Sequence, residues 1–395
     1  MAGYNDVSNL RVPDSGFTVN TGRSRGVASG KVAPVQLLVV VAALLIYGLV
    51  VVWSAVQGNP DFSFKKQLFG VALGIVAMMV FQFFDYRRLA GMVPLLLIIN
   101  AVLILSPHLP YIGVEAKGAR SWINVGMQIQ PGEFAKITVI LLDAAVISRY
   151  EGRLDSLKEY VKCLCIIAVP FVLIMTQPDL GTGTVYLIIG IFCLVMGGAR
   201  WRYLIGTLLV GVSLIAAVLI IDQVSFASTG SYLILDDYQH GRINTFLDPT
   251  ADSSGDSYNF NQALIAIGSG GLFGKGLGNA TQSSLGFLPE APTDFIFCVL
   301  AEQFGFVGAL VLIVLYVLLV VNAIKISKAS GDMFGTLIVM GILGMWLFHI
   351  FENIGMDIGL MPITGIPLPF MSYGSSFMLV NLSLVGLICS VYTHR

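Results

Sequence analysis

The sequence has little charge: Asp, Glu, Lys and Arg together make up 11% of its 395 residues, whereas 56% are hydrophobic. A soluble domain carries about a quarter charged residues, so this chain cannot cover itself with polar surface. The 22 basic residues nearly balance the 23 acidic ones, which leaves no charge surplus for binding nucleic acid. The composition therefore predicts an integral membrane protein.

Cysteine and histidine are also scarce. The five cysteines lie in apolar runs, and their odd number without a recurring spacing argues against a disulfide framework or a metal cluster. The four histidines are scattered, and no two are spaced as paired metal ligands. We identify no cofactor or metal-ligand set, and the sequence leaves open whether a divalent cation assists the activity.

Long apolar stretches are abundant. A membrane-crossing helix needs about 20 apolar residues, and ten stretches qualify. They lie at 34–56, 67–84, 89–106, 132–149, 160–177, 181–198, 202–222, 295–324, 333–354 and 372–393. The sequence thus predicts an all-α polytopic membrane protein with one transmembrane domain, residues 34–395. Residues 1–33, rich in Gly, Ser and Asn, are expected to be a disordered leader.

The positions of Lys and Arg predict the orientation, because cytoplasmic loops carry an excess of basic residues. With an even number of spans, the side that holds both termini carries 15 basic residues and the other side six, with Lys136 inside a span. Both termini are therefore predicted to be cytoplasmic. Three long polar segments, 107–131, 223–294 and 355–371, then face outward, and the second is a large extracellular loop between helices seven and eight.

A glycine-rich run, Gly268-Ser-Gly-Gly-Leu-Phe-Gly-Lys-Gly-Leu-Gly278, lies in this large loop. It does not match a phosphate-binding loop, because Gly276 stands where that motif needs Ser or Thr and no strand precedes it. We interpret it as a cluster of turns that lets backbones approach closely. The preceding stretch, 259–267, could form an interfacial or re-entrant helix.

Charged residues at membrane depth are candidates for function, because a charge there is costly. They are Glu133, Lys136, Asp143, Asp179, Asp294, Glu302, Glu352 and Asp357. Glu133 and Lys136 are three apart, hence on one helix face. They follow Gln130 and Pro131, and Pro131 suits the first position of a helix. The pair either neutralises itself at the helix start or holds a cation at the mouth of a cavity.

Asp294 stands at the outer start of the eighth predicted span, after prolines that prevent helix upstream. Its carboxylate either caps this helix, which contributes about 0.3–1 kcal/mol, or takes part in catalysis. Glu302 lies eight residues on along the same face and is expected to be a buried hydrogen-bond partner. Trp122, near Lys117 and Arg120, is either an interface anchor or a platform for a sugar or diphosphate.

A series of motifs follows the ten spans in order. They are Arg120-Ser-Trp-Ile-Asn124, Gln130-Pro-Gly-Glu-Phe-Ala-Lys136, Gln177-Pro-Asp-Leu-Gly-Thr182, Ala266-Ile-Gly-Ser-Gly-Gly-Leu-Phe-Gly-Lys-Gly276, Phe287-Leu-Pro-Glu-Ala-Pro-Thr-Asp-Phe-Ile-Phe297, Ala301-Glu-Gln-Phe-Gly305, Asn353-Ile-Gly, Gly365-Ile-Pro-Leu-Pro369, Ser372-Tyr-Gly374 and Thr393-His-Arg395. With them the chain resembles the SEDS family of shape, elongation, division and sporulation proteins, most closely its rod-shape branch, from residue 34 to residue 395. It departs from the family pattern at Gly132, where a serine is usual, and at Ser375, where a glycine is usual.

The resemblance implies a peptidoglycan glycosyltransferase that polymerises lipid II on the outer face of the bacterial cytoplasmic membrane. It also implies a class B penicillin-binding protein and other elongation-complex membrane proteins as partners. Asp294 matches the family's catalytic carboxylate, expected to act as general base, and Trp122 matches a functional tryptophan. Cations would stabilise the leaving diphosphate. The other candidate substrate-binding residues are Arg120 and Lys136 as first choices, then Lys117, Arg242, Lys275 and Glu133, with supporting roles for Gln130, Pro131, Asp179 and Glu302.

Other functions stay open from the sequence. A lipid II flippase could use buried charges such as Glu133, Lys136, Glu302 and Glu352 to pass a polar headgroup. The lack of clear similarity between the two halves and the outward concentration of polar residues favour the enzyme. A scaffold that recruits cell-wall enzymes would need none of these side chains. The division and sporulation members of the family would share the same chemistry.

Overall fold

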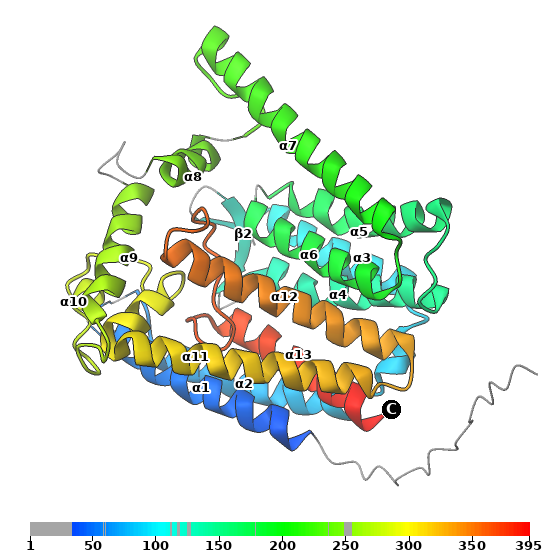
Figure 1. Cartoon of the computed structure of the whole chain (residues 1–395), viewed down its shortest axis with the longest axis horizontal. Helices are drawn as coiled ribbons and strands as arrows, with labels where there is room; N and C mark the ends of the chain where they lie inside the picture. The colour runs from blue at the N-terminus through cyan, green and yellow to red at the C-terminus, as the bar shows by residue number, and fades with distance from the viewer. Residues whose placement is uncertain are drawn as a thin grey trace, which may run out of the picture.

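The computed structural model describes residues 34–57, 59, 61–110, 113–116, 119–124, 128–177, 179–235, 237–248 and 255–395 (Figure 1). The predicted leader, 1–33, and Lys117 lie outside the described residues, so the expectations for them stay predictions.

Helices occupy all ten ranges predicted to span the membrane. They are α1 (Val35–Ala55), α2 (Phe64–Phe83), α3 (Val93–Leu105), α4 (Pro131–Ile147), α5 (Leu157–Ile174), α6 (Leu180–Met196), α7 (Trp201–Thr229), α11 (Ile296–Lys328), α12 (Met333–Asp357) and α13 (Ser375–Thr393). Among the described residues, six of these helices, α1, α2, α7, α11, α12 and α13, are long and apolar enough to cross a membrane by length and composition. The helical architecture is therefore confirmed, whereas the count of ten crossings stays a prediction.

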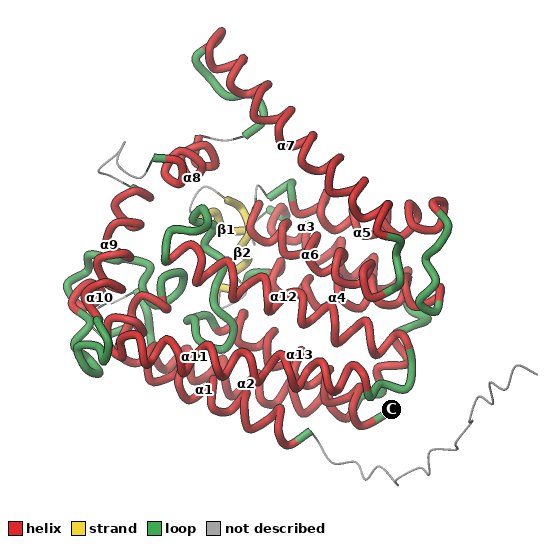
Figure 2. The backbone as a smooth tube through the Cα atoms, viewed as in Figure 1, coloured by secondary structure: helices red, strands yellow, loops and turns green. Residues whose placement is uncertain are grey.

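A small antiparallel sheet in the first outward segment corrects the all-α prediction. Its strands β1 (Gly113–Ala116), β2 (Ala119–Asn124) and β3 (Gln128–Ile129) pair in that order, with Trp122 opposite Val114. Figure 2 shows the strands at the same end of the bundle as most of the long loops. Strands this short carry too little alternation of apolar and polar residues to stand out in a sequence.

The large loop predicted at 223–294 contains regular structure. α7 continues to Thr229, beyond its predicted end at residue 222, and the short helices α8 (Asp237–Leu247), α9 (Asp256–Gly270) and α10 (Thr281–Ser284) follow. α9 confirms a helix over 259–267, although its depth relative to a membrane stays a prediction. Figure 1 shows α7 projecting away from the other helices, and Asp222 is the one buried residue of its range Trp201–Thr229.

Asp222 fixes the path of the chain from α7 to α8. Its carboxylate accepts hydrogen bonds from three successive backbone amides, those of residues 233–235, at 2.7–3.0 Å. Nε2 of His240 lies 3.1 Å from the same carboxylate, and the Tyr232 ring stacks on the His240 ring at 3.6 Å. A buried carboxylate is stable here because its oxygens are hydrogen-bonded, and the arrangement sets the position of α8.

The glycine-rich run packs backbone to backbone against α11. That helix is interrupted at Gly305, whose φ of 63° and ψ of −161° are not helical. The amides of Phe306 and Val307 donate to two carbonyls of the glycine-rich run, and a Cβ at Gly274 would lie 2.1 Å from a carbonyl oxygen of α11. The interpretation as turns with close backbone approach is confirmed, and the run satisfies backbone groups that the break in the helix exposes.

α2 and α13 run against each other through small residues. A Cβ added at Gly70 would lie 2.6 Å from Cα of Ser375, and one at Gly386 would lie 2.3 Å from the carbonyl oxygen of Met78. Small residues at such contacts let membrane helices approach closely. Buried Gln67 of α2 adds a polar link, because its Oε1 accepts a 2.9 Å hydrogen bond from the Gly374 amide just before α13.

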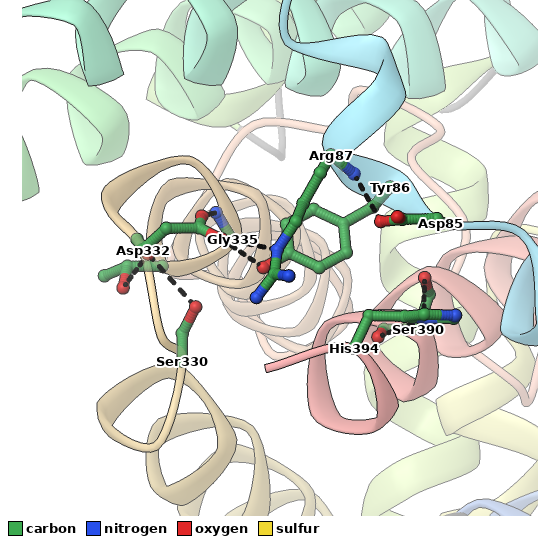
Figure 3. A network of polar contacts seen from close by, with 9 residues as sticks. Asp85, Tyr86, Arg87, Ser330, Asp332, Gly335, Ser390 and His394 are labelled. Carbon is green, nitrogen blue, oxygen red and sulfur yellow. Dashed lines mark hydrogen bonds and ion pairs between the residues drawn. The ribbon is translucent and has the colours of Figure 1, made fainter. Parts of the chain in front are cut away.

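At the other ends of these two helices, a polar cluster joins the α2–α3 and α11–α12 connections (Figure 3). The Tyr86 hydroxyl donates to Oδ2 of Asp332 at 2.5 Å, and Nε of Arg87 lies 3.2 Å from the same oxygen. Oδ1 of Asp332 accepts from the Gly335 amide and so caps α12. Burial, reinforced by the hydrogen bond to Asp332, raises the pKa of Tyr86 to about 12, so the phenol stays a donor.

Candidate active site

A cavity of about 1050 Å³ lies among the N-terminal ends of α2, α4, α6 and α13, strand β2, helix α8 and the segment 362–367. Its charged and aromatic lining residues include Asp61, Lys65, Lys66, Phe69, Trp122, Glu133, Lys136, Asp179, Arg242, Glu290, Asp294, Tyr373 and Phe377. Pockets for small molecules usually measure about 300–1,000 Å³. This cavity therefore has room for a ligand at or above the upper end of that range, with both charged and apolar parts.

The cavity brings together most of the residues singled out in the sequence. Trp122, Glu133, Lys136, Arg242 and Asp294 all line it, although more than 170 residues separate the first from the last in the chain. The supporting candidates Gln130 and Asp179 also line it, and Pro131 is buried at the first position of α4. Arg120 lies on β2, and the structure describes its backbone but not its side chain.

Lys136 and Glu133 form a buried ion pair on α4, with Nζ of Lys136 2.6 Å from Oε1 of Glu133. Nζ of Lys136 also lies 3.4 Å from Nε2 of His349 on α12. Nδ1 of His349 is 2.9 Å from the carbonyl oxygen of Pro367. Because a carbonyl can only accept, Nδ1 carries the proton in the neutral ring and Nε2 accepts from Lys136. The sequence left two alternatives for Glu133 and Lys136, a pair that neutralises itself or a cation at a cavity. The structure combines them, because the ion pair itself lies in the cavity wall.

Asp294 lies in the cavity wall just before α11. The helix begins at Ile296 with Phe295 as its N-cap residue. Asp294 is therefore not the N-cap residue but the residue before it, whereas stabilisation of its charge by the helix dipole stays a prediction. Nδ2 of Asn353, on α12, donates to the backbone carbonyl of Asp294 at 2.7 Å. This contact holds the main chain of Asp294 in place while its side chain lines the cavity.

Gly365 leaves room for the Asp294 carboxylate. Its φ of 74° is in the left-handed region that favours glycine. A Cβ at this position would lie 3.1 Å from Oδ2 of Asp294 and 3.8 Å from Nη2 of Arg242. The neighbouring carbonyl of Thr364 accepts a 2.7 Å hydrogen bond from Nη1 of Arg242. A carboxylate and a guanidinium thus converge on one short piece of backbone.

Trp122 contributes an aromatic face to the cavity. It is half-buried on β2, and the pairing with β1 sets its direction. Phe62 and Tyr373 also line the cavity, and their rings pack edge to face with centroids 5.1 Å apart. The cavity therefore offers aromatic surfaces of the kind that bind the faces of sugar rings, together with cations.

Lys275 does not reach the cavity, which corrects its predicted place beside the substrate. Its Nζ lies 2.6 Å from Oε1 of Glu302 and 2.9 Å from Oγ1 of Thr281. Glu302 also accepts from the Thr281 amide at 2.9 Å, which makes it a buried hydrogen-bond hub between α11 and the glycine-rich run. Asp179 caps α6 by accepting from the Thr182 amide at 2.9 Å and the Thr182 hydroxyl at 2.8 Å.

The sequence reasoning missed several contributors. Lys65 and Lys66 at the start of α2 line the cavity, although they entered the sequence analysis only as two of the six basic residues on the outward side. Two adjacent cations at the outer start of a span were a usable signal. His349 carried none, because a single histidine on an apolar helix gives no indication of its partners. Among the described residues, no group of three or more His, Cys, Asp or Glu side chains could hold a metal ion.

Comparison with known proteins gives one family. A family model described as cell cycle protein, for FtsW, RodA and SpoVE, matches residues 33–395. The chain is 39% identical to peptidoglycan glycosyltransferase MrdB of Escherichia coli K12, over 91% of this chain and 93% of that protein. It is 35% identical to stage V sporulation protein E of Bacillus subtilis, over 91% of this chain and 97% of that protein.

Solved structures have the same fold. One, described as the structural coordination of polymerization and crosslinking by a peptidoglycan synthase complex, contains a chain that matches with a TM-score of 0.74 and 28% identity, covering 92% of this chain and 98% of that one. The rod shape determining protein RodA of Thermus thermophilus matches with a TM-score of 0.66 and 27% identity, covering 92% of this chain and 97% of that one.

Proposed function

The chain belongs to the FtsW, RodA and SpoVE family of cell cycle proteins, and on that premise we propose that it is a peptidoglycan glycosyltransferase that polymerises lipid II into β-1,4-linked glycan strands. The observation that carries the proposal is a single large cavity that joins Asp294, Trp122 and several cations. Relatives named peptidoglycan glycosyltransferase support it. The structural similarity to a rod shape determining protein supports the rod-shape branch and a role in cell elongation.

In this proposal the helices of all ten predicted spans cross the bacterial cytoplasmic membrane, both termini are cytoplasmic and the cavity opens toward the outside. The distribution of basic residues supports this orientation. The cavity lies where α2, α4, α6 and α13 begin, whereas the Tyr86–Asp332 cluster lies where α2 and α13 end. The reacting sugars of membrane-tethered lipid II would then meet the cavity just above the outer headgroups.

Asp294 acts as the general base. It takes the proton from the 4-hydroxyl of the acceptor N-acetylglucosamine, and that oxygen forms a bond to C1 of the donor N-acetylmuramic acid. The bond from C1 to the diphosphate oxygen breaks, undecaprenyl diphosphate leaves with the electron pair, and the configuration at C1 is inverted. One base is sufficient, because a diphosphate leaves without being protonated.

Cations of the cavity stabilise the negative charge that develops on the leaving diphosphate. Lys136 and Arg242 are held in place by Glu133 and the Thr364 carbonyl, at 2.6 and 2.7 Å. Lys65 and Lys66 add two further cations to the cavity lining, and we keep Arg120 as a candidate from the sequence. Glu133 reduces the net charge around Lys136, so the site can release the diphosphate as well as hold it. Trp122 supports the face of a sugar ring.

We also propose a class B penicillin-binding protein as partner, since glycan strands must be cross-linked where they are made. The similarity to a chain in a structure of a peptidoglycan synthase complex that couples polymerization and crosslinking supports this. Other membrane proteins of the elongation complex would associate with the same assembly.

The test uses the full chain purified with its penicillin-binding partner and supplied with labelled lipid II. We expect glycan polymer from the wild type, none from Asp294→Ala, and wild-type amounts from Asp155→Ala, which removes an exposed carboxylate far from the cavity. Polymer from Asp294→Ala at the wild-type rate would overturn the general-base role. A wild type that forms no polymer but moves lipid II across liposome membranes would be a flippase, and one with neither activity would be a scaffold.

A further inference from the structure

One face of α12 fastens the segment 362–367, which forms part of the cavity wall. Residues 352 and 353 lie three and four positions after 349, so both share a face with it. The three contacts join Nδ1 of His349 to the Pro367 carbonyl at 2.9 Å, Nδ2 of Asn353 to the Ile366 carbonyl at 2.9 Å, and the Thr364 hydroxyl to Oε1 of Glu352. All three α12 side chains are buried, so the segment is tied down from behind.

The fastened segment contacts both charged groups at the Asp294 side of the cavity. The carbonyl of Thr364 accepts from Nη1 of Arg242 at 2.7 Å. The next residue, Gly365, lies against Oδ2 of Asp294. Rotation of the peptide between these two residues would move the carbonyl away from Arg242 and break this hydrogen bond. The orientation of this one peptide therefore sets Arg242 relative to Asp294.

Glu352 is placed to hold that peptide. It does not line the cavity but lies behind it, and its side chain is 2% exposed. Its Oε1 accepts from the hydroxyl of Thr364, and its Oε2 has no hydrogen-bond partner among the described residues. A buried carboxylate at membrane depth is costly and is rare without a function. An apolar side chain would fill the same space without that cost, so packing alone does not account for a carboxylate here.

We propose that Glu352 is a positioning residue for glycosyl transfer. Its carboxylate accepts a hydrogen bond from the Thr364 hydroxyl and thereby fixes the backbone carbonyl of Thr364. That carbonyl orients the Arg242 guanidinium relative to the Asp294 carboxylate. The inference rests on the proposed function, since it assigns Arg242 to the diphosphate and Asp294 to the acceptor. A displacement of about 1 Å in such a constellation can lower a rate about 100-fold.

Two pairs of variants test the hydrogen bond from both ends. Thr364→Val removes the donor at nearly constant shape, and Thr364→Ser keeps it. Glu352→Val removes the acceptor, and Glu352→Gln keeps an oxygen that can accept. With the purified complex and lipid II, we expect the two valine variants to lose about tenfold or more in kcat, with KM changed far less. Thr364→Ser and Glu352→Gln should stay within about threefold of the wild type.

A double-mutant cycle separates positioning from a structural role. If Glu352 acts through Arg242, Glu352→Val should add little to the loss already caused by Arg242→Lys, because the oriented guanidinium is gone. If the losses of kcat in the two single variants add in full in the double variant, and if they accompany a lower thermal unfolding temperature, the inference is overturned in favour of a structural role. Where Glu352→Val fails to fold, the Thr364 pair gives the same comparison.

The remaining outcomes distinguish the inference from the function on which it rests. Wild-type kcat in Glu352→Val and Thr364→Val, together with an inactive Asp294→Ala, would overturn the inference and leave the proposed function standing. A wild-type complex that forms no polymer would overturn the proposed function and the inference with it.

Discussion

The ammonium group of Lys136 lies 2.6 Å from Oε1 of Glu133, and both side chains are almost completely buried. Removing one member of such a pair leaves the other charge buried without compensation, which costs about 3–5 kcal/mol, whereas removing both can be nearly neutral. Single and double variants of this pair therefore distinguish a loss of stability from the loss of a cation at the cavity.

We expect Lys136→Met to lower both the thermal unfolding temperature and the polymerisation rate. The double variant Lys136→Met with Glu133→Gln should recover most of the stability, because no buried charge remains, but none of the activity. Unfolding in detergent and lipid II polymerisation measure the two properties separately. Recovery of polymerisation in the double variant would show that the Lys136 cation has no part in the reaction.

Gly365→Ala should lower kcat through Asp294. The left-handed φ of 74° costs a residue with a Cβ about 1–2 kcal/mol, and the new methyl group would lie 3.1 Å from Oδ2 of Asp294. Gly230→Ala is the matched control, because Gly230 has a φ of 76° and no heavy atom within 4 Å of an added Cβ. Both variants should lose similar stability, and Gly365→Ala alone should lose activity. Equal rates in the two variants would contradict a close contact with the Asp294 carboxylate.

Trp122→Ala should weaken substrate use. An aromatic platform that covers a sugar ring contributes about 1.5–3 kcal/mol through burial of its apolar surface, so kcat/KM should fall about tenfold or more. Trp122→Phe should keep part of the apolar contact and so lose less kcat/KM than Trp122→Ala. Trp201→Ala is the control, since Trp201 is 72% exposed at the start of α7 and does not line the cavity. Equal kcat/KM values for the two alanine variants would remove Trp122 from the substrate site.

Lys275→Met should affect stability rather than substrate binding. Its removal leaves Glu302 without an ion-pair partner, and a buried polar group with an unmet hydrogen bond costs about 1–3 kcal/mol. The KM for lipid II should remain that of the wild type, as should the KM of the control Lys328→Met, an exposed lysine at the end of α11. A raised KM in Lys275→Met at unchanged stability would return this lysine to the substrate-binding residues.

Gly386→Leu should separate α2 from α13. A Cβ at Gly386 would lie 2.3 Å from a backbone oxygen of α2, and overpacking of a close contact costs about 1–3 kcal/mol or more. Gly211→Leu, in the middle of α7 with no heavy atom within 4 Å of an added Cβ, should be neutral or stabilising, because leucine favours helix more than glycine does. Thermal unfolding of both variants measures the difference, and similar values would contradict the tight contact.

The sequence located the helices well because, in a membrane protein, apolar length dominates every other local signal. It placed Glu133 and Lys136 on one face, because that conclusion needs only helical spacing. The resemblance selected Asp294 and Trp122, which spacing alone left ambiguous between structural and functional roles. The predicted start of α11, residue 295, was one residue early, since Thr293, Asp294 and Phe295 form turns before the helix begins.

Relations between distant segments could not be read from the sequence. Lys275 looked like one outward cation among several until the fold placed it against Glu302, 27 residues away. His349 and Glu352 acquire a role only when the segment 362–367 turns back onto α12. The short β-strands depend on pairing with each other, and their own residues give a weak pattern. Long-range contacts decided each of these points, and one sequence does not contain them.

The packing of α2 against α13 has a consequence for biosynthesis. The polar link between Gln67 and Gly374 joins positions 307 residues apart, and the cavity draws its lining from residue 61 to residue 377. During translation α2 therefore lacks its packing partner, and its glycine face stays uncovered until α13 has been made. A chain that stops between α11 and α13 would carry Asp294 and the cations of the cavity, but it would lack the part of the cavity wall that residues 373–377 supply. The cavity is therefore complete only after α13 has been made.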